Sequence, residues 1–272
     1  MARPIPIALV GRPNVLATCA LEAPAGGVEA VRVSVSGDSG ADEAASAIAG
    51  GGFEAVVAFE PEALPGGLVA DWDVPTIGWT TLDASSGFRG VDRVIVTGAA
   101  PPGSGVWRSL AFPVADSGFG PARPRGAPPR GLWLCGDTAR RREYLSHFEP
   151  SVEVAVVEGD LSEGLAATDI GVNLHDRPGR ALHHEAARSL AAGQLLVSEP
   201  LDPARGLEPG IDFIEAPELG DVHLAIEAAG ADLGAFQRIR LRGRLKAERF
   251  RASAVYPKLV GDLLEDLRVF GR

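Results

Sequence analysis

The chain has 272 residues, of which 46% are hydrophobic and 23% are charged, and its formal net charge at pH 7 is −10. This length suits two domains of ordinary size, and the negative charge argues against non-specific binding of nucleic acid or anionic membranes. No stretch approaches the roughly 18 apolar residues that a transmembrane helix needs, and the apolar run near the N-terminus is too short for a signal-peptide core. The sequence therefore predicts a cytoplasmic protein without a transmembrane segment.

Cysteine and lysine are both rare. Cys19 and Cys135 are the only cysteines and lie far apart, so neither a disulfide framework nor a cysteine-based zinc site is expected. Lys246 and Lys258 are the only lysines. An anionic ligand would therefore be held by arginine side chains or backbone amides, and guanidinium suits a diphosphate because it binds in a bidentate manner.

The first half of the chain contains short apolar runs separated by glycine-rich breaks, which predict the strands of a parallel sheet. The runs span residues 5–10, 31–35, 55–59, 74–79 and 93–97, and a helix of small residues is expected over 41–49. Residues 118–130 (GFGPARPRGAPPR) follow and are rich in proline and arginine. Such a segment is typical of a semi-rigid linker. We therefore expect a first domain over 1–117 and a second over 131–272.

The second half alternates strands and helices in the order of a doubly wound, Rossmann-like sheet. Strands are expected over 132–135, 153–157, 169–175, 195–198 and 212–215, and helices over 140–147, 161–167, 181–192 and 222–229. The tail, 244–270, should form a long helix interrupted and kinked by Pro257. Its apolar face predicts that this helix crosses back to the first domain.

Ligands of open parallel sheets bind at the carboxyl ends of the strands. That edge should carry residues 11–14, 136–142, 173–185 and 198–206. Asn173 and His175 end one strand, and Glu185 follows in the first turn of the next helix, from which it can reach the edge. A carboxylate there also stabilises the helix dipole, so a purely structural role for Glu185 stays open. The same alternative stays open for His183 and His184 as polar residues at a helix start.

Several familiar motifs are absent. The sequence after the first strand, GRPNV, is not the GxGxxG of dinucleotide-binding domains, and neither a phosphate-binding GxxxxGK[ST] loop nor a GxSxG nucleophile motif occurs. His183 and His184 are adjacent rather than one turn apart, so they cannot both face one metal ion from a helix. No metal site is expected.

Four segments of the second half resemble the C-terminal domain of GT-B glycosyltransferases, most closely the CgeB-like branch of the group 1 relatives. They are TDIGVNLH (168–175), ALHHEAARSLAAGQLLVSEP (181–200), GLEPGIDFIEAPE (206–218) and the tail 244–267. The resemblance implies two facing Rossmann-like domains and a nucleotide-sugar donor, a UDP-sugar or GDP-sugar, with no further cofactor. It assigns the binding of the ribose hydroxyls to Glu185.

The resemblance also implies a wider set of donor-binding residues. Arg140 or Arg141 would neutralise the diphosphate. The other members of the set are Asn173, His175, Arg180, His184, Gly136 and, in the first domain, Gly11. The predicted function is transfer of a sugar from a nucleotide-sugar to an acceptor that the sequence does not identify.

This chain also departs from the family. Arg177 stands where many retaining relatives have an acidic residue, and no lysine is available for the diphosphate. The candidates for a catalytic base are Glu60, Asp83 and Asp116, each near a strand end. Two alternatives therefore stay open. One is a GT-B-like protein that binds a nucleotide or a protein partner without catalysis, and the other is a different α/β enzyme acting on a phosphorylated metabolite.

Overall fold

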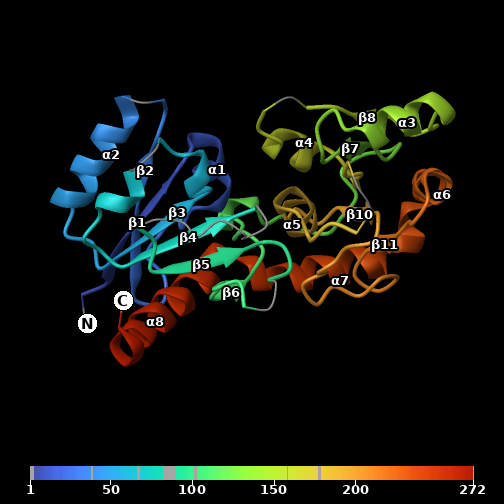
Figure 1. Cartoon of the computed structure of the whole chain (residues 1–272). Coiled ribbons are helices and arrows are strands. Elements are labelled where there is room, and N and C mark those ends of the chain that lie inside the picture. Colours follow the sequence, from blue (N-terminus) through green and yellow to red (C-terminus); the bar gives the residue numbers. More distant parts are fainter. Residues whose placement is uncertain are drawn as a thin grey trace. The chain divides into compact units, whose positions relative to one another are not determined.

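The computed structural model describes residues 3–37, 39–65, 68–81, 90–100, 103–157, 159–176 and 179–271. The chain divides into two compact units (Figure 1). Unit 1 comprises Met1–Asp116 and Phe250–Arg272, and unit 2 comprises Ser117–Arg249. Each unit is an α/β domain with a parallel sheet, as the sequence predicts.

Unit 1 is built on a six-stranded parallel sheet with the strand order β2-β1-β3-β4-β5-β6. The strands are β1 (Ile5–Gly11), β2 (Val28–Ser34), β3 (Ala55–Phe59), β4 (Thr76–Thr80), β5 (Arg93–Val96) and β6 (Arg108–Ser109). Residues of β3 and β4 are buried throughout. Their continuous apolar runs are typical of parallel strands that are covered on both faces.

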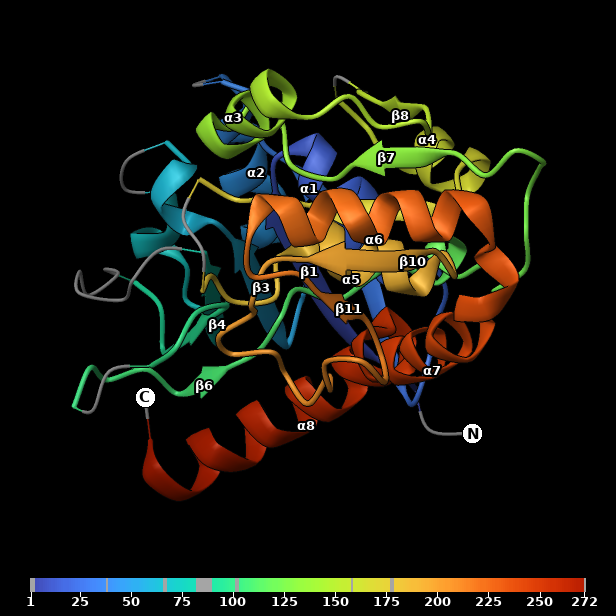
Figure 2. The ribbon, with the colours of Figure 1, turned by 90° about the vertical axis from the view of Figure 1, so that its right-hand side faces the viewer.

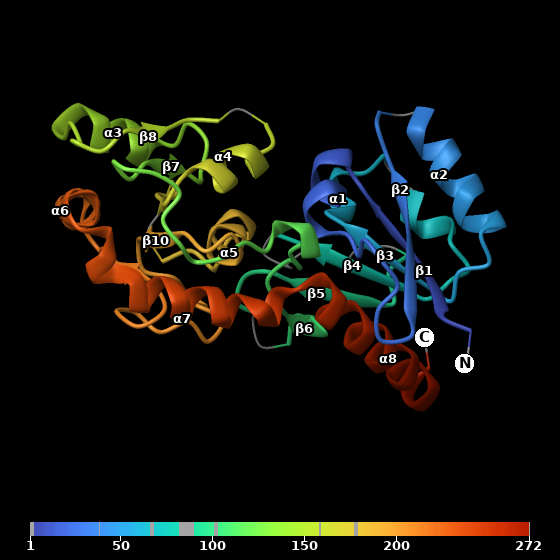
Figure 3. The same ribbon diagram turned by 180° about the vertical axis from the view of Figure 1, so that it is seen from behind.

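The helices of unit 1 cover both faces of this sheet (Figure 3). They are α1 (Pro13–Cys19), α2 (Ser39–Gly50) and α8 (Ala252–Phe270). Ile48 of α2 packs in one core with Val56 of β3, whereas Leu263 of α8 packs with Val57 on the other face. The hydroxyl of Tyr256 in α8 donates a hydrogen bond of 2.8 Å to the carbonyl of Cys19, which ties α8 to the end of α1.

Unit 2 has a five-stranded parallel sheet with the order β11-β10-β9-β7-β8. The strands are β7 (Gly131–Trp133), β8 (Val154–Ala155), β9 (Ile170–Asn173), β10 (Leu195–Ser198) and β11 (Ile214–Glu215). The helices are α3 (Ala139–His147), α4 (Ser162–Ala167), α5 (His184–Ala191), α6 (Leu219–Ala231) and α7 (Gln237–Ala247). In Figure 2, α6 runs alongside β10, and its Val222 and Ile226 pack in one core with Val197.

Close packing on the sheet positions α5. Ala187 and Leu190 of α5 are fully buried. A Cβ on Gly171 of β9 would lie 2.1 Å from the Oγ of Ser189, so only glycine allows α5 this close to β9. The helix that carries Glu185 is therefore held firmly against the strand that precedes it.

The proline-rich segment 118–130 is part of unit 2 rather than a separate spacer. Gln237 donates a hydrogen bond of 2.6 Å to the carbonyl of Ala122, and Arg240 donates one of 3.0 Å to the carbonyl of Arg123. The amide of Arg125 donates to Asp169 Oδ1 at 2.9 Å. These bonds to distant parts of unit 2 fix the segment along its length.

The tail is interrupted before Pro257, so the predicted break at this proline is wrong. The helix α7 ends at Ala247, residues Glu248–Phe250 form a 3-10 turn, and α8 continues through Pro257 in its second turn. The interruption has a physical cause, because the backbone here pairs with Val114. The carbonyl of Phe250 accepts a hydrogen bond of 2.7 Å from Val114, and the amide of Ala252 donates one of 2.9 Å back to it.

Candidate functional site

A polar cavity of about 570 Å³ opens at the carboxyl edge of the unit 2 sheet. It lies where β7 ends and α5 begins, which is where the strand-end rule places ligands. The lining combines apolar side chains with a group of polar and ionisable ones. The lining residues are Trp133, Leu134, Cys135, Gly136, Asp137, Arg141, Val156, Val157, Gly159, Leu161, His175, His183 and Glu185. We call it the strand-edge cavity.

Glu185 enters this cavity from the first turn of α5. Its side chain is 25% exposed, and its Oε1 lies 3.8 Å from Nη1 of Arg188. Its Oε2 is buried and has no hydrogen-bond partner among the residues that the structure describes. A buried carboxylate oxygen without a partner is costly, so this atom is well suited to accept hydrogen bonds from a ligand.

His175 is held by its backbone and by one ring nitrogen. Its amide donates a hydrogen bond of 3.1 Å to Glu199, and its Nδ1 lies 3.5 Å from the sulfur of Cys135. Its Nε2 is buried without a hydrogen-bond partner in the described part of the chain. Burial, helped by the nearby His183 and Arg180, lowers the pKa of His175 to about 4. The imidazole is therefore neutral at pH 7.

Asn173 takes a structural role in the fold rather than a place in the cavity lining. It is fully buried at the end of β9, where its Nδ2 donates to Ser198 Oγ at 2.8 Å. Its Oδ1 accepts from the Cys135 thiol at 3.3 Å. Asn173 thereby fastens the ends of β7, β9 and β10 together at the edge that carries the site.

Arg140 and Arg141 of α3 have different partners. Arg140 Nε forms an ion pair with Glu199, whose side chain is only 1% exposed. Arg141 lines the strand-edge cavity, donates to the carbonyl of Gly136 at 3.0 Å and lies 3.7 Å from Asp137. Its Nε is buried without a hydrogen-bond partner in the described structure. Arg141 is therefore the better placed of the two to meet an anionic ligand.

The remaining predicted residues, His184, Arg180 and Gly11, are not part of the cavity lining. His184 is half-buried in α5 beside Glu185, and burial lowers its pKa to about 4. Arg180 is exposed and does not line the cavity, although its charge acts on His175. Gly11 ends β1 and belongs to unit 1.

The corresponding edge of unit 1 has a hollow of its own, of about 410 Å³. Arg12 and Asn14, which follow β1, line it together with Ser36. Of the candidate bases, Asp116 is engaged by α8, since it pairs with Arg251 at 3.1 Å and accepts a hydrogen bond from Ser253. Glu60 is half-buried at the end of β3, and Asp83 lies outside the described residues.

Sequence reasoning did not single out Cys135, which lines the cavity, or Glu199, which accepts the hydrogen bond from the amide of His175. Burial and the charge of Glu185 raise the pKa of Cys135 to about 12, so it is a neutral thiol. Burial also raises the pKa of Glu199. Glu199 directly follows a buried strand, which is the signal that could have identified it.

Among the residues described, no group of three or more His, Cys, Asp and Glu side chains is placed to hold a metal ion. No helix in the same set is long and apolar enough to span a membrane.

The solved structures to which the chain is similar include several glycosyltransferases. The chain is similar to a glycosyltransferase from Rickettsia africae, with 11% identity, a TM-score of 0.59 and coverage of 97% of this chain and 100% of the other. It is also similar to sucrose-phosphate synthase from Thermosynechococcus elongatus, with 12% identity, a TM-score of 0.57 and coverage of 97% and 99%. A third similar structure is HepE from Anabaena, solved with UDP and glucose. Its identity to this chain is 12% and its TM-score is 0.56, with coverage of 96% of this chain and 100% of the other.

No protein-family model and no curated protein matches the sequence. The structural similarities extend over the whole chain and over the whole of each neighbour. They show the fold, which is that of GT-B glycosyltransferases with two Rossmann-like α/β domains. The more specific assignment to the CgeB-like branch stays a prediction.

Proposed function

We propose that the chain is a glycosyltransferase that binds a nucleoside-diphosphate sugar in the strand-edge cavity and transfers the sugar to an acceptor. The observation that carries this proposal is the buried, unpartnered Oε2 of Glu185 in a cavity at the carboxyl edge of a Rossmann-like sheet. A carboxylate accepts two hydroxyl hydrogen bonds at once, and the two hydroxyls of a ribose offer them side by side. The GT-B fold and the UDP complex of HepE support the same donor class.

Arg141 supplies the positive charge for the donor diphosphate. Arg141 lines the cavity, and the N–H group at its Nε has no hydrogen-bond acceptor among the described residues. The helix start beside it contributes less, because the amide of Arg141 is capped by Thr138 and the amide of Ala139 bonds to Asp176. A departing diphosphate is stabilised by a fixed guanidinium of this kind, since charge develops on the leaving group during transfer.

His175 and Glu199 prepare the site in different ways. His175 is neutral, so its Nε2 exchanges hydrogen bonds with the donor without adding charge. Glu199 does not line the cavity, but it holds both the amide of His175 and the side chain of Arg140. It acts as a positioning residue that joins the loop after β9 to the start of α3.

The proposal is tested by incubating the protein with UDP-sugars and GDP-sugars and measuring the released UDP or GDP, with water as the acceptor. Release should occur with one donor class and fall at least tenfold in Glu185→Ala and in Arg141→Ala. Glu163→Ala is the matched control, because Glu163 is an exposed glutamate in the first turn of α4. Equal release by Glu185→Ala and by the unmutated protein would contradict the proposal.

Binding of a nucleotide without sugar transfer is the second candidate function. The observation that favours it is the engagement of Asp116 by Arg251 and Ser253, which occupies one of the candidate bases. Arg140 is likewise committed to Glu199. The same experiment separates the two functions, because this alternative predicts that UDP or GDP binds while no nucleotide is released from any donor.

A further inference from the structure

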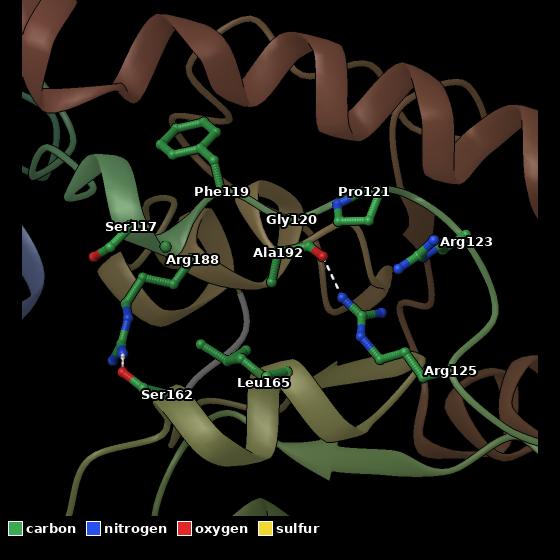
Figure 4. A pocket seen from close by; sticks show the side chains of 12 residues that line it. Ser117, Phe119, Gly120, Pro121, Arg123, Arg125, Ser162, Leu165, Arg188 and Ala192 are labelled. Atoms are coloured by element: carbon green, nitrogen blue, oxygen red, sulfur yellow. Dashed lines mark hydrogen bonds between the residues drawn. The ribbon is translucent and has the colours of Figure 1, made fainter.

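Unit 2 contains a second cavity, of about 480 Å³, between residues 117–125, α4 and α5 (Figure 4). It shares no lining residue with the strand-edge cavity. Figure 4 shows Arg188 and Ser162 at one end and Arg123 and Arg125 at the other, with Leu165 between them. We call it the arginine pocket. Nothing in the proposed donor binding uses it.

The three arginines of this pocket are not equally neutralised. Arg188 is 6% exposed and is matched by Asp160, whose Oδ1 lies 3.0 Å from its Nη2. Arg123 and Arg125, in contrast, form no ion pair with any carboxylate that the structure describes. The carboxylate that acts on Arg125, Asp169, is ion-paired with Arg240 at 3.3 Å. Two neighbouring guanidinium groups therefore have no ion-pair partner among the described residues, in a chain whose net charge is −10.

Arg125 also has an unused hydrogen-bond donor. Its Nη2 donates to the carbonyl of Ala192, but its Nη1 is buried and lacks a partner within the described structure. Burial lowers the pKa of Arg125, and the nearby Arg123 lowers it further. Leaving a charged donor buried and unpaired is costly, and a bound oxyanion would remove that cost.

The rest of the pocket wall is largely apolar. Phe119, Leu165 and Ala192 contribute to it, and Leu165 is 5% exposed. The guanidinium of Arg244 lies 4.8 Å from the centre of the Phe119 ring, which helps to hold this ring in place. A cavity of this size with apolar walls and a few converging charged groups is typical of a small-molecule site.

We propose that the arginine pocket binds a small molecule that carries an oxyanion group, a phosphate or a carboxylate, on an apolar body. Arg123 and Arg125 bind the oxyanion, since guanidinium groups form strong charge-assisted hydrogen bonds with both groups. Leu165 and Phe119 contact the apolar body. The proposal does not depend on the proposed transferase activity, because the two cavities have separate walls.

The test is calorimetric titration of the whole chain with phenyl phosphate and with benzoate at constant ionic strength, with benzyl alcohol as the uncharged control. At least one of the two anions should bind, and the comparison between them identifies the preferred oxyanion. Binding should weaken about tenfold or more in Arg123→Ala, whose exposed side chain makes no structural ion pair, and should be unchanged in Arg238→Ala. Arg238 is a matched control because it is an exposed arginine of unit 2 outside the pocket.

Two further measurements locate the bound probe. Ala166→Trp, at an exposed position of the pocket wall, should block binding, while saturating UDP should leave it unchanged. The proposal is overturned if neither anion binds or if benzyl alcohol binds equally well. It is also overturned if UDP displaces the probe, if Arg238→Ala weakens binding as much as Arg123→Ala, or if Ala166→Trp binds the probe normally.

Discussion

Mild acid should destabilise this protein, because two histidines beside the site resist protonation in the folded state. His175 is the first of them. Burial lowers its pKa from 6.5 to about 4. The neighbouring His183 and Arg180 add to this shift, and Asp176 opposes it. The imidazole of His175 takes up its proton readily only after the chain unfolds.

His184 behaves in the same way. Burial lowers its pKa from 6.5 to about 4, Arg188 and His183 act in the same direction, and Glu185 opposes them. Because both folded-state pKa values lie below the unfolded value of 6.5, the unfolded chain binds more protons between these limits. The stabilisation is therefore fully present above pH 6.5 and is lost progressively as the pH falls from 6.5 to 4.

The magnitude follows from these shifts. Between pH 7 and pH 5 the unfolded form of each histidine becomes almost fully protonated, while the folded form stays largely neutral. Below pH 6.5 the loss is about 1.4 kcal/mol for each pH unit, so each histidine contributes a loss of about 2 kcal/mol down to pH 5, and the pair about 4 kcal/mol. Carboxylates with a lowered pKa, such as Asp160, change the stability only at pH values below this interval.

Urea denaturation at pH 7, 6 and 5 measures this loss. Between pH 7 and pH 5 the unmutated chain and the double variant His175→Gln/His184→Gln should both lose free energy of unfolding. The loss in the double variant should be smaller by about 4 kcal/mol. His147→Gln is the control, because His147 is exposed in the last turn of α3. Equal losses in the unmutated chain and the double variant would refute the reasoning.

Three further predictions concern buried charges and the thiol. Arg140→Met should lower the free energy of unfolding by about 3–5 kcal/mol in urea denaturation, because it leaves Glu199 buried without its ion-pair partner. A loss below about 1 kcal/mol, the value typical of a solvent-exposed ion pair, would contradict this prediction. Arg240→Met should cost a similar amount, because it removes the ion-pair partner of the buried Asp169, and an unchanged denaturation midpoint would contradict this. The Cys135 thiol should react at pH 8 roughly a thousandfold more slowly in the folded than in the unfolded chain, since its pKa rises from 9.0 to about 12, and equal labelling rates would rule this out.

The strands were predictable wherever burial alone decides the local structure. The runs 55–59 and 195–198 match β3 and β10 in both bounds, because every residue of each strand is buried. The helix α1 was not predicted. Its seven residues, PNVLATC, are too few to display a helical repeat, and only Pro13 at its start is a helix signal.

Features that depend on distant partners could not be read from local sequence. The break between α7 and α8 exists because Phe250 and Ala252 pair with Val114, more than 100 residues earlier. Segment 118–130 has the composition of a linker, but it packs in unit 2 because Gln237 and Arg240 bond to its carbonyls. Both outcomes are decided by tertiary contacts that override local preference.

The site likewise combines features that local sequence predicts with features that depend on distant partners. The strand-end rule brought Glu185, His175 and Gly136 to one edge of the sheet, and the structure places all three in the lining of one cavity. The sequence could not separate Arg140 from Arg141, because their difference depends on Glu199, which lies almost 60 residues further along the chain. Side-chain pairing of this kind is visible only in three dimensions.

Calorimetric titration with UDP and with GDP tests the central claim most directly. The account predicts that one of them binds with a stoichiometry of one. Glu185→Ala should weaken this binding by about 10-fold to 100-fold, because hydrogen bonds to a charged group contribute about 1.5–3 kcal/mol. Glu163→Ala should leave it unchanged. Failure of both nucleotides to bind, or binding to Glu185→Ala as tight as to the unmutated chain, would contradict the account.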